Sequence, residues 1–147
     1  MSAKRKSRKP SVSSSAAPPE SEALLFIDRC AWSRSLDEAL RRADIPFVAH
    51  RDRFEPACPD EEWLAVAGRE DWIVITRDQA IRRKPNELQA FRDARLSLFV
   101  LASGNATAAD TARLLVGLYP KILELAKAAE RPAMYSVTLS GSIRAVR

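Results

Sequence analysis

The chain has 147 residues, which is enough for one domain with a hydrophobic core and short for two. Hydrophobic residues make up 46% and charged residues 29% of it, and no apolar run approaches the roughly 20 residues that a membrane helix needs. We therefore expect a globular protein that does not span a membrane. The formal net charge of +5 arises in residues 1–9, which hold five basic residues and no acid, so the remainder carries 19 of each sign.

The N-terminal segment predicts a disordered basic tail over residues 1–21, followed by one folded domain over residues 22–147. Such a tail either holds a polyanion electrostatically or only solubilises the terminus. It lacks the apolar core of a secretory signal. Cys30 and Cys58 form no disulfide or zinc pattern with the single histidine, His50. These features predict a cytoplasmic protein with reduced thiols.

The first ordered elements are expected between residues 23 and 56. The unbroken apolar run at 23–27 predicts a strand that is buried on both faces. Ser35 and Glu38 have the spacing of a capping box at the start of an amphipathic helix. Residues 46–49 predict a second short strand, and the polar stretch 50–56 predicts a connecting loop.

The middle of the chain predicts two further strands, each preceded by a helix. Pro59 and the three acids after it are typical of a helix start, and the helix is expected to end at Gly68. Residues 72–76 predict the third buried strand. A helix is expected over 86–94 and a fourth strand over 96–101.

The last part of the chain predicts a turn, a divided helix and a terminal strand. Residues 103–105 predict the turn, and Thr107 opens the helix. Pro120 is expected to kink or split that helix before residues 122–125. The alternation of apolar residues over 135–139 predicts a terminal edge strand.

Strands and helices that alternate with long connections predict a parallel sheet with helices on its faces. The expected class is α/β, in three α/β/α layers around a mostly parallel sheet of about four strands. A C-terminal helical segment and an edge strand complete the expected fold.

Three aspartates are expected at one edge of this sheet. Asp28 ends the first strand and Asp78 follows the third by two residues, and ligands bind beyond the carboxyl ends of parallel strands. Asp60 opens a helix, about 60° or less in helical phase from the apolar stripe that faces the sheet, whereas Glu61 lies at its flank and Glu62 on its solvent side. Three carboxylates repel one another unless a cation lies among them, and oxygen ligands favour Mg²⁺ or Mn²⁺ over zinc. Taken singly, each aspartate also suits a turn or a helix cap.

Three segments between residues 24 and 105 resemble the PIN-like domains, nuclease relatives that include the VapC-type toxins of bacterial toxin-antitoxin pairs. They are Phe26-Ile27-Asp28, the helix start from Pro59 to Leu64, and Ile73-Val74-Ile75-Thr76-Arg77-Asp78. The apolar strand followed by Thr-x-Asp is the most diagnostic of the three.

The resemblance implies a Mg²⁺- or Mn²⁺-dependent endoribonuclease, a hydrolase of RNA phosphodiester bonds. Asp28, Asp60 and Asp78 are then the catalytic, metal-binding acids, and Thr76 supports them by hydrogen bonding. The resemblance further implies the toxin of a type II toxin-antitoxin pair, with RNA as its substrate and an antitoxin as its partner. Whether such a protein forms a homodimer is left open.

The sequence departs from the family where many PIN domains carry a further acid soon after the residue that matches Asp78. Here no carboxylate follows until Glu87, so the number of metal ions stays open, with Asn105 or Glu61 as a replacement ligand or a single ion as the alternative. Four basic residues beside the site suit RNA phosphates, although exposed charge runs look the same in sequence. They are Arg77, Arg82, Arg83 and Lys84.

Two other classes of protein are alternatives to the nuclease. A catalytically weak or inactive PIN-like module that binds a protein partner or RNA is favoured by the missing acid. An aspartate phosphotransferase commonly has a second acid two residues after its nucleophile, and Cys30 stands there. Nucleotide-binding glycine motifs do not occur in the chain.

Overall fold

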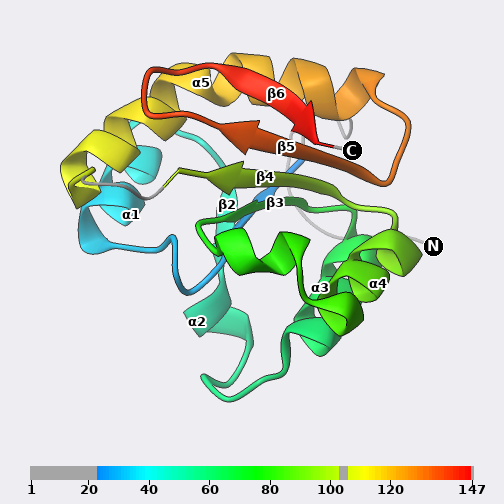
Figure 1. Cartoon of the computed structure of the whole chain (residues 1–147). Helices are drawn as coiled ribbons and strands as arrows, with labels where there is room; N and C mark the ends of the chain where they lie inside the picture. Colours follow the sequence, from blue (N-terminus) through cyan, green and yellow to red (C-terminus); the bar gives the residue numbers. More distant parts are fainter. Residues whose placement is uncertain (1–22, 103–105, 147) are drawn as a thin grey trace, which may run out of the picture.

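A computed structural model of the chain describes residues 23–102 and 106–146 (Figure 1). The strands of these ranges are β1 (Leu25–Ile27), β2 (Phe47–Ala49), β3 (Ile73–Thr76), β4 (Ser97–Leu101), β5 (Ala133–Val137) and β6 (Ile143–Val146). The helices are α1 (Arg34–Arg42), α2 (His50–Arg53), α3 (Asp60–Glu70), the 3-10 helix η3 (Gln79–Arg82), α4 (Pro85–Ala94) and α5 (Ala108–Ala128). The tail predicted over residues 1–21 and the turn at 103–105 lie outside the described residues.

The described strands form one sheet in the order β2-β1-β3-β4-β5-β6. All neighbouring strands are parallel except β6, which runs antiparallel to β5. Ile27 pairs with Ile75 across β1 and β3, so the carboxyl ends of these two strands lie side by side. The mostly parallel α/β class is confirmed, with six strands in the described residues where about four were expected.

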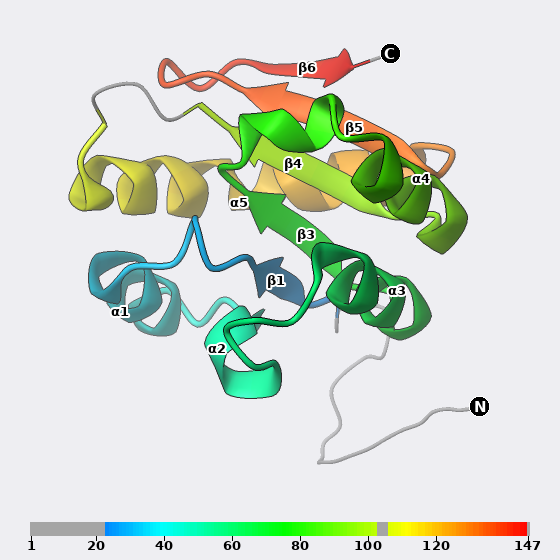
Figure 2. The same ribbon diagram turned by 60° about the horizontal axis from the view of Figure 1, so that its bottom comes forward.

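Helices cover both faces of the sheet, as Figure 2 shows, with α1 and α5 on one side and α3 and α4 on the other. The strands are buried on both faces, which is why their sequences are apolar runs rather than alternating patterns. Leu25 and Ile27 pack into the core with α1 and α5, whereas Phe26 between them packs with α3 and α4. The three-layer α/β/α arrangement is therefore confirmed.

Helices α3 and α4 approach each other closely at a glycine. A Cβ atom on Gly68 would lie 2.5 Å from the backbone oxygen of Ala94, so only glycine fits this contact. The prediction that the helix ends at Gly68 was wrong, because α3 extends past this residue. The helix continues to Glu70 and is capped by Asp71 in the left-handed conformation.

One further local prediction was wrong, since the side chain of Ser33, not Ser35, caps α1 by accepting from the Leu36 amide. The polar stretch 50–56 contains the short helix α2. Of the two outcomes expected at Pro120, a kink or a split, the split does not occur, because α5 continues through this residue. This proline is exposed, and water can hydrogen-bond a backbone carbonyl that a proline leaves without its amide partner.

The C-terminal strand also differs from the expectation. The alternating residues that predicted an edge strand belong in part to β5, which is an inner strand between β4 and β6. The edge is formed by β6, whose residues are half-buried or exposed. Within the described ranges, the longest helix is not apolar enough to cross a lipid bilayer.

Candidate active site

The site lies where β1 and β3 end, because a polar residue follows each strand at the same edge of the sheet. Asp28 comes directly after β1, and its backbone amide donates to the Ile75 carbonyl at 3.0 Å. Asp78 lies two residues beyond β3 and caps η3 by accepting from the Ala80 amide at 2.9 Å. The parallel pairing of the strands therefore places both loops together.

Asp28 is buried and held by several donors. Its Oδ1 accepts from the Arg29 amide at 2.7 Å, and its Oδ2 accepts from the Thr76 hydroxyl at 2.7 Å. The same Thr76 Oγ1 accepts from the Asp78 amide at 3.1 Å. One fully buried hydroxyl thus links the loop after β1 to the loop after β3.

The thiol of Cys30 also faces this loop. Its Sγ donates to Asp28 Oδ2 at 3.4 Å and accepts from the Arg77 amide at 3.2 Å. Burial, followed by the charge of Asp28, raises the pKa of the Cys30 thiol to about 11. The thiol is therefore protonated at neutral pH and acts here as a hydrogen-bond donor, not as a nucleophile.

Three carboxylates converge next to this loop. One oxygen from each of Asp60, Asp78 and Glu87 lies within 4.8 Å of the others. Asp60 is the first residue of α3 and Glu87 lies in the first turn of α4. The indole of Trp63, one turn into α3, donates to Asp60 Oδ1 at 2.9 Å and fixes that carboxylate. We call Asp60, Asp78 and Glu87 the acidic cluster.

The carboxylate of Glu87 is only partly stabilised by the residues around it. Its side chain is 15% exposed, and its Oε1 is buried without a hydrogen-bond partner in the described structure. Burial, and next the charge of Asp60, raise the pKa of the Glu87 carboxyl, while Lys84 opposes this. A carboxylate in this environment is stabilised by a proton or by a cation.

Two basic side chains lie beside the acidic cluster. The Nζ of Lys84 is 3.8 Å from Asp78 Oδ2 and 3.6 Å from Glu87 Oε2. The guanidinium of Arg29 lies 4.0 Å from Asp60 Oδ1 and also donates to the Pro56 carbonyl. Asp78, followed by Glu87, raises the pKa of the Lys84 ammonium.

Beneath the acids lies an aromatic layer around His50, which is 1% exposed. Its ring packs against Phe26, Phe54 and Trp63, with ring centroids 6.1, 5.4 and 6.2 Å away. Burial, followed by the charge of Arg29, lowers the pKa of the imidazole, and neither ring nitrogen has a partner in the described structure. His50 is therefore a neutral core residue at neutral pH.

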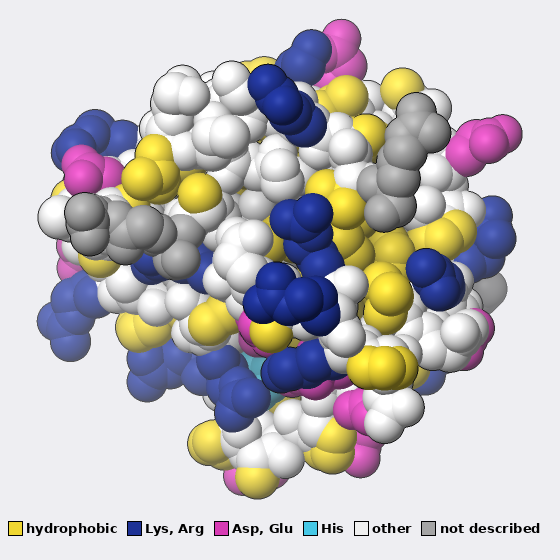
Figure 3. All heavy atoms as spheres, viewed as in Figure 1, with side chains coloured by type: hydrophobic (Ala, Val, Ile, Leu, Met, Phe, Trp, Pro, Cys, Tyr) yellow, Lys and Arg dark blue, Asp and Glu magenta, His cyan; other side chains and the backbone are white. Residues whose placement is uncertain are grey.

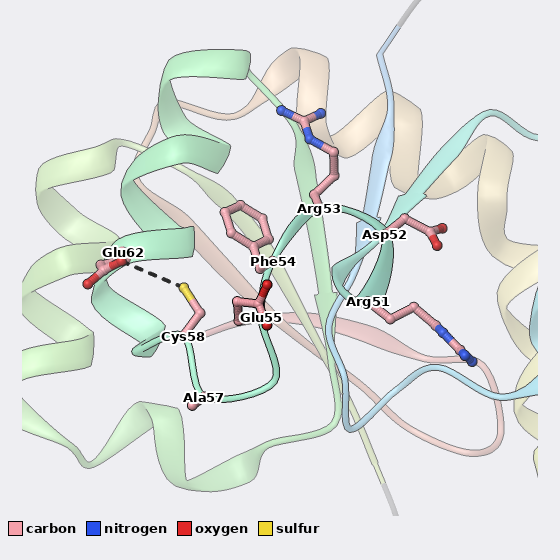
Figure 4. Close-up of a pocket in the computed structure, with 8 residues that line it drawn as sticks. All are labelled: Arg51, Asp52, Arg53, Phe54, Glu55, Ala57, Cys58 and Glu62. Atoms are coloured by element: carbon pink, nitrogen blue, oxygen red, sulfur yellow. Dashed lines mark hydrogen bonds between the residues drawn. The ribbon is translucent and has the colours of Figure 1, made fainter.

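A hollow lies along the connection from α2 to α3 (Figure 4). Its volume is about 610 Å³, and Glu62 on its wall accepts a hydrogen bond from the Cys58 thiol. The lining carries Arg51 and Arg53 together with acids, so it lacks the uniform charge of a polyanion groove. None of the acidic cluster lines it.

The basic residues predicted to bind phosphate lie in the segment between β3 and α4, which also carries Asp78. Arg82, Arg83 and Lys84 are exposed on η3 and the turn before α4, and Arg77 is half-buried. Figure 3 shows Lys and Arg side chains gathered in the middle of the face that Figure 1 presents, with acidic side chains visible between them.

The structure thus brings some of the predicted site residues together and leaves others apart. Asp60 and Asp78 join the acidic cluster, and Asp28 is joined to Asp78 through Thr76. Glu61 is exposed and outside the cluster, and Asn105 lies outside the described residues. Glu87 was not predicted as a site residue. The signal was present, since a helix that follows β3 with Pro85 at its start must begin at the carboxyl edge of the sheet.

The fold and the site define an α/β/α domain with a group of carboxylates beyond the carboxyl ends of its parallel strands. The family model for the PIN like domain matches residues 24–103, more than half of the chain, and the chain belongs to this family. Searches among curated proteins and among solved structures return no match. PIN domains are generally nucleases and typically use divalent metal ions, so the family places the chain in a superfamily of hydrolases.

Proposed function

We propose that this protein is a metal-dependent endoribonuclease that hydrolyses RNA phosphodiester bonds with Mg²⁺ or Mn²⁺. The observation that carries the proposal is the acidic cluster, in which three carboxylates lie within 4.8 Å and one buried oxygen of Glu87 has no partner among the described residues. Carboxylate oxygens are the ligands that these ions prefer. Oxygen ligands of an ion with bonds of about 2.1 Å lie roughly 3.0 Å apart when adjacent and roughly 4.2 Å apart when opposite, so small side-chain rotations would bring the three carboxylates to bonding distance.

Different residues of the chain have different roles in the proposed reaction. Asp60, Asp78 and Glu87 would hold the ion, and Thr76 links the carboxylate of Asp28 to the backbone amide of Asp78. A bound ion supplies Lewis acidity and lowers the pKa of a water molecule that attacks the phosphorus. Arg77, Arg82 and Arg83, in the segment between β3 and α4, would hold RNA phosphates, since one guanidinium group can bind two phosphate oxygens.

Glu87 takes the place of the further acid that many PIN domains carry close to the residue matching Asp78. It reaches the cluster from α4 rather than from the loop after β3. Asp60, Asp78 and Glu87 thereby form a set of three carboxylates, although the segment 79–84 holds no acid. Their arrangement supports one ion at the acidic cluster.

The toxin of a type II toxin-antitoxin pair is the finer form of this proposal, with RNA as substrate, an antitoxin as inhibitor and a homodimer as assembly. Its support is the resemblance of the three motifs to VapC-type toxins. Cys30 and Cys58 are both free thiols, which supports a cytoplasmic location.

An inactive PIN-like module that binds a protein partner or RNA is the second candidate. It is favoured by Lys84, whose ammonium already lies beside Asp78 and Glu87 where a nuclease holds a metal ion. The two candidates differ in whether a divalent ion binds at the acidic cluster.

Thermal unfolding with increasing Mn²⁺ separates them. At a hundredfold excess over its Kd, a bound ion contributes about 2.7 kcal/mol, which raises the Tm by roughly 5–10 °C in a protein of this size. Asp78→Asn and Glu87→Gln should abolish the shift and lower RNA cleavage by roughly a hundredfold. Glu124→Gln, which removes an exposed acid of α5, should leave both unchanged. A wild-type protein without a saturable shift, or with cleavage that persists in EDTA, is not a metal-dependent nuclease.

A further inference from the structure

We infer that Lys84 is a built-in counter-ion of the acidic cluster, which the divalent ion must displace, so that this one side chain sets the metal concentration at which the site fills. The inference rests on the proposed function, because it concerns the same metal site. It assigns Lys84 a role that differs from simple phosphate binding.

The geometry around Lys84 carries the inference. Its Nζ lies 3.8 Å from Asp78 Oδ2 and 3.6 Å from Glu87 Oε2, so one ammonium contacts two of the three clustered acids. Lys84 is the residue before α4, and Glu87 is three residues further on. The start of the helix therefore holds the backbone of Lys84 close to the acidic cluster. The Lys84 side chain is still 50% exposed, which leaves it room to swing into solvent.

Competition follows from charge. In the metal-free protein the ammonium reduces the repulsion among Asp60, Asp78 and Glu87. A divalent ion bound by the same oxygens would lie within a few ångströms of that ammonium and repel it. Binding must therefore either proceed against this repulsion or move Lys84 away, and both raise the Kd for the ion.

Displacement gives Lys84 a second position. An ammonium that leaves Asp78 and Glu87 stays tethered to the start of α4, next in sequence to the exposed Arg82 and Arg83. A phosphate group of RNA is the anion that this arrangement then attracts. Neutralising Lys84 is thus expected to strengthen metal binding and to weaken RNA binding, opposite effects that a damaged fold does not produce.

A second ion pair in the same protein provides a matched control. Lys121 lies 3.6 Å from Glu124 with the same spacing of three residues, on α5, and is similarly exposed. No residue of the acidic cluster takes part in it. Lys121→Gln therefore removes an equivalent charge from the surface without changing the contacts of the cluster.

The test is a Mn²⁺ titration of the full chain by calorimetry, with wild type, Lys84→Gln, Lys84→Arg and Lys121→Gln in parallel. Lys84→Gln is expected to lower the Kd for Mn²⁺ on the order of tenfold, since a unit charge next to a divalent ion is removed. Lys84→Arg, which keeps the charge, and Lys121→Gln should bind Mn²⁺ as the wild type does or more weakly. Binding of a non-cleavable RNA analogue should weaken in Lys84→Gln alone.

The outcomes distinguish this inference from the proposed function. If wild type binds Mn²⁺ and Lys84→Gln binds it no more tightly, the counter-ion role is overturned and the metal site stands. If neither binds Mn²⁺, the metal site itself is rejected. Equal tightening in Lys84→Gln and Lys121→Gln would show a general effect of net charge and would also overturn the role of Lys84. The Tm of each metal-free variant reports that it is folded.

Discussion

At the scale of single residues, the three aspartates were accessible to sequence reasoning because each follows a strong local pattern. Asp28 and Asp78 end apolar strands, and the helical phase of Asp60 distinguishes it from Glu61 and Glu62, which are exposed in the structure. Pro85 could have placed Glu87 at the carboxyl edge of the sheet, but the contact of Glu87 with Asp60 depends on how α4 packs against α3. Side chains that meet through packing of two helices cannot be paired from one sequence.

Thr76 offers a test of how the acids are held. Thr76→Val keeps the shape of the side chain and removes the hydroxyl that joins Asp28 to the Asp78 amide, which should cost about 1–3 kcal/mol of the free energy of unfolding and weaken Mn²⁺ binding. Urea unfolding and a Mn²⁺ titration measure the two effects.

The control is Thr111, a buried threonine of α5 whose hydroxyl has no partner in the described structure. Thr111→Val should leave stability unchanged or raise it by roughly 1 kcal/mol, because an unsatisfied polar group is removed. Equal losses in both variants would mean that the Thr76 hydroxyl has no special role.

At the scale of elements, the mistakes arose where tertiary packing overrides a local signal. A glycine commonly ends a helix, but Gly68 lies inside α3, at a point where Ala94 of α4 comes too close for any larger side chain. The short helix α2 and the uninterrupted course of α5 through Pro120 likewise oppose local propensity. The strands were predicted more accurately, since burial on both faces leaves a continuous apolar run.

Replacing Gly68 tests the contact between α3 and α4. Gly68→Ala should destabilise the protein by about 1–3 kcal/mol, because the new methyl group meets the backbone of Ala94. The variant should also bind Mn²⁺ more weakly, since Asp60 and Glu87 stand at the starts of the two helices that are pushed apart.

Gly117 is the matched position for this change. It lies in α5, and a Cβ added there meets no atom within 4 Å. Gly117→Ala should raise stability by roughly 0.5–1 kcal/mol through helix propensity alone, and leave Mn²⁺ binding unchanged. Both variants are compared by urea unfolding. A neutral Gly68→Ala would show that the helices are not in tight contact.

At the scale of the whole molecule, the family match ends at residue 103, yet the sheet continues for two more strands. Tyr135 of β5 stacks on Phe99 of β4 with ring centroids 4.8 Å apart, and β5 buries Met134 and Val137 as well. The sequence predicted a strand in this part of the chain, but not that it is internal. A strand's neighbours are set by long-range pairing, which no local pattern records.

Two truncations separate the roles of the last strands. A chain that ends at residue 129 loses β5 and exposes Phe99 and the edge of β4, so we expect no cooperative thermal transition. A chain that ends at residue 141 loses only β6, whose side chains are half-buried or exposed, and should keep a cooperative transition at a lower Tm. Cooperative unfolding of the shorter chain would show that the core does not need β5.

The aromatic layer beneath the acids has an electrostatic consequence for the molecule as a whole. Phe26, Trp63 and a neutral His50 are buried and carry no charge, so the interior side of the site has a low dielectric constant. The field of the carboxylates is then poorly screened from the interior and is focused toward solvent. A cation that approaches from solvent meets this attractive potential, which the exposed Arg82, Arg83 and Lys84 partly oppose. The rate at which ions reach the site should fall steeply with ionic strength.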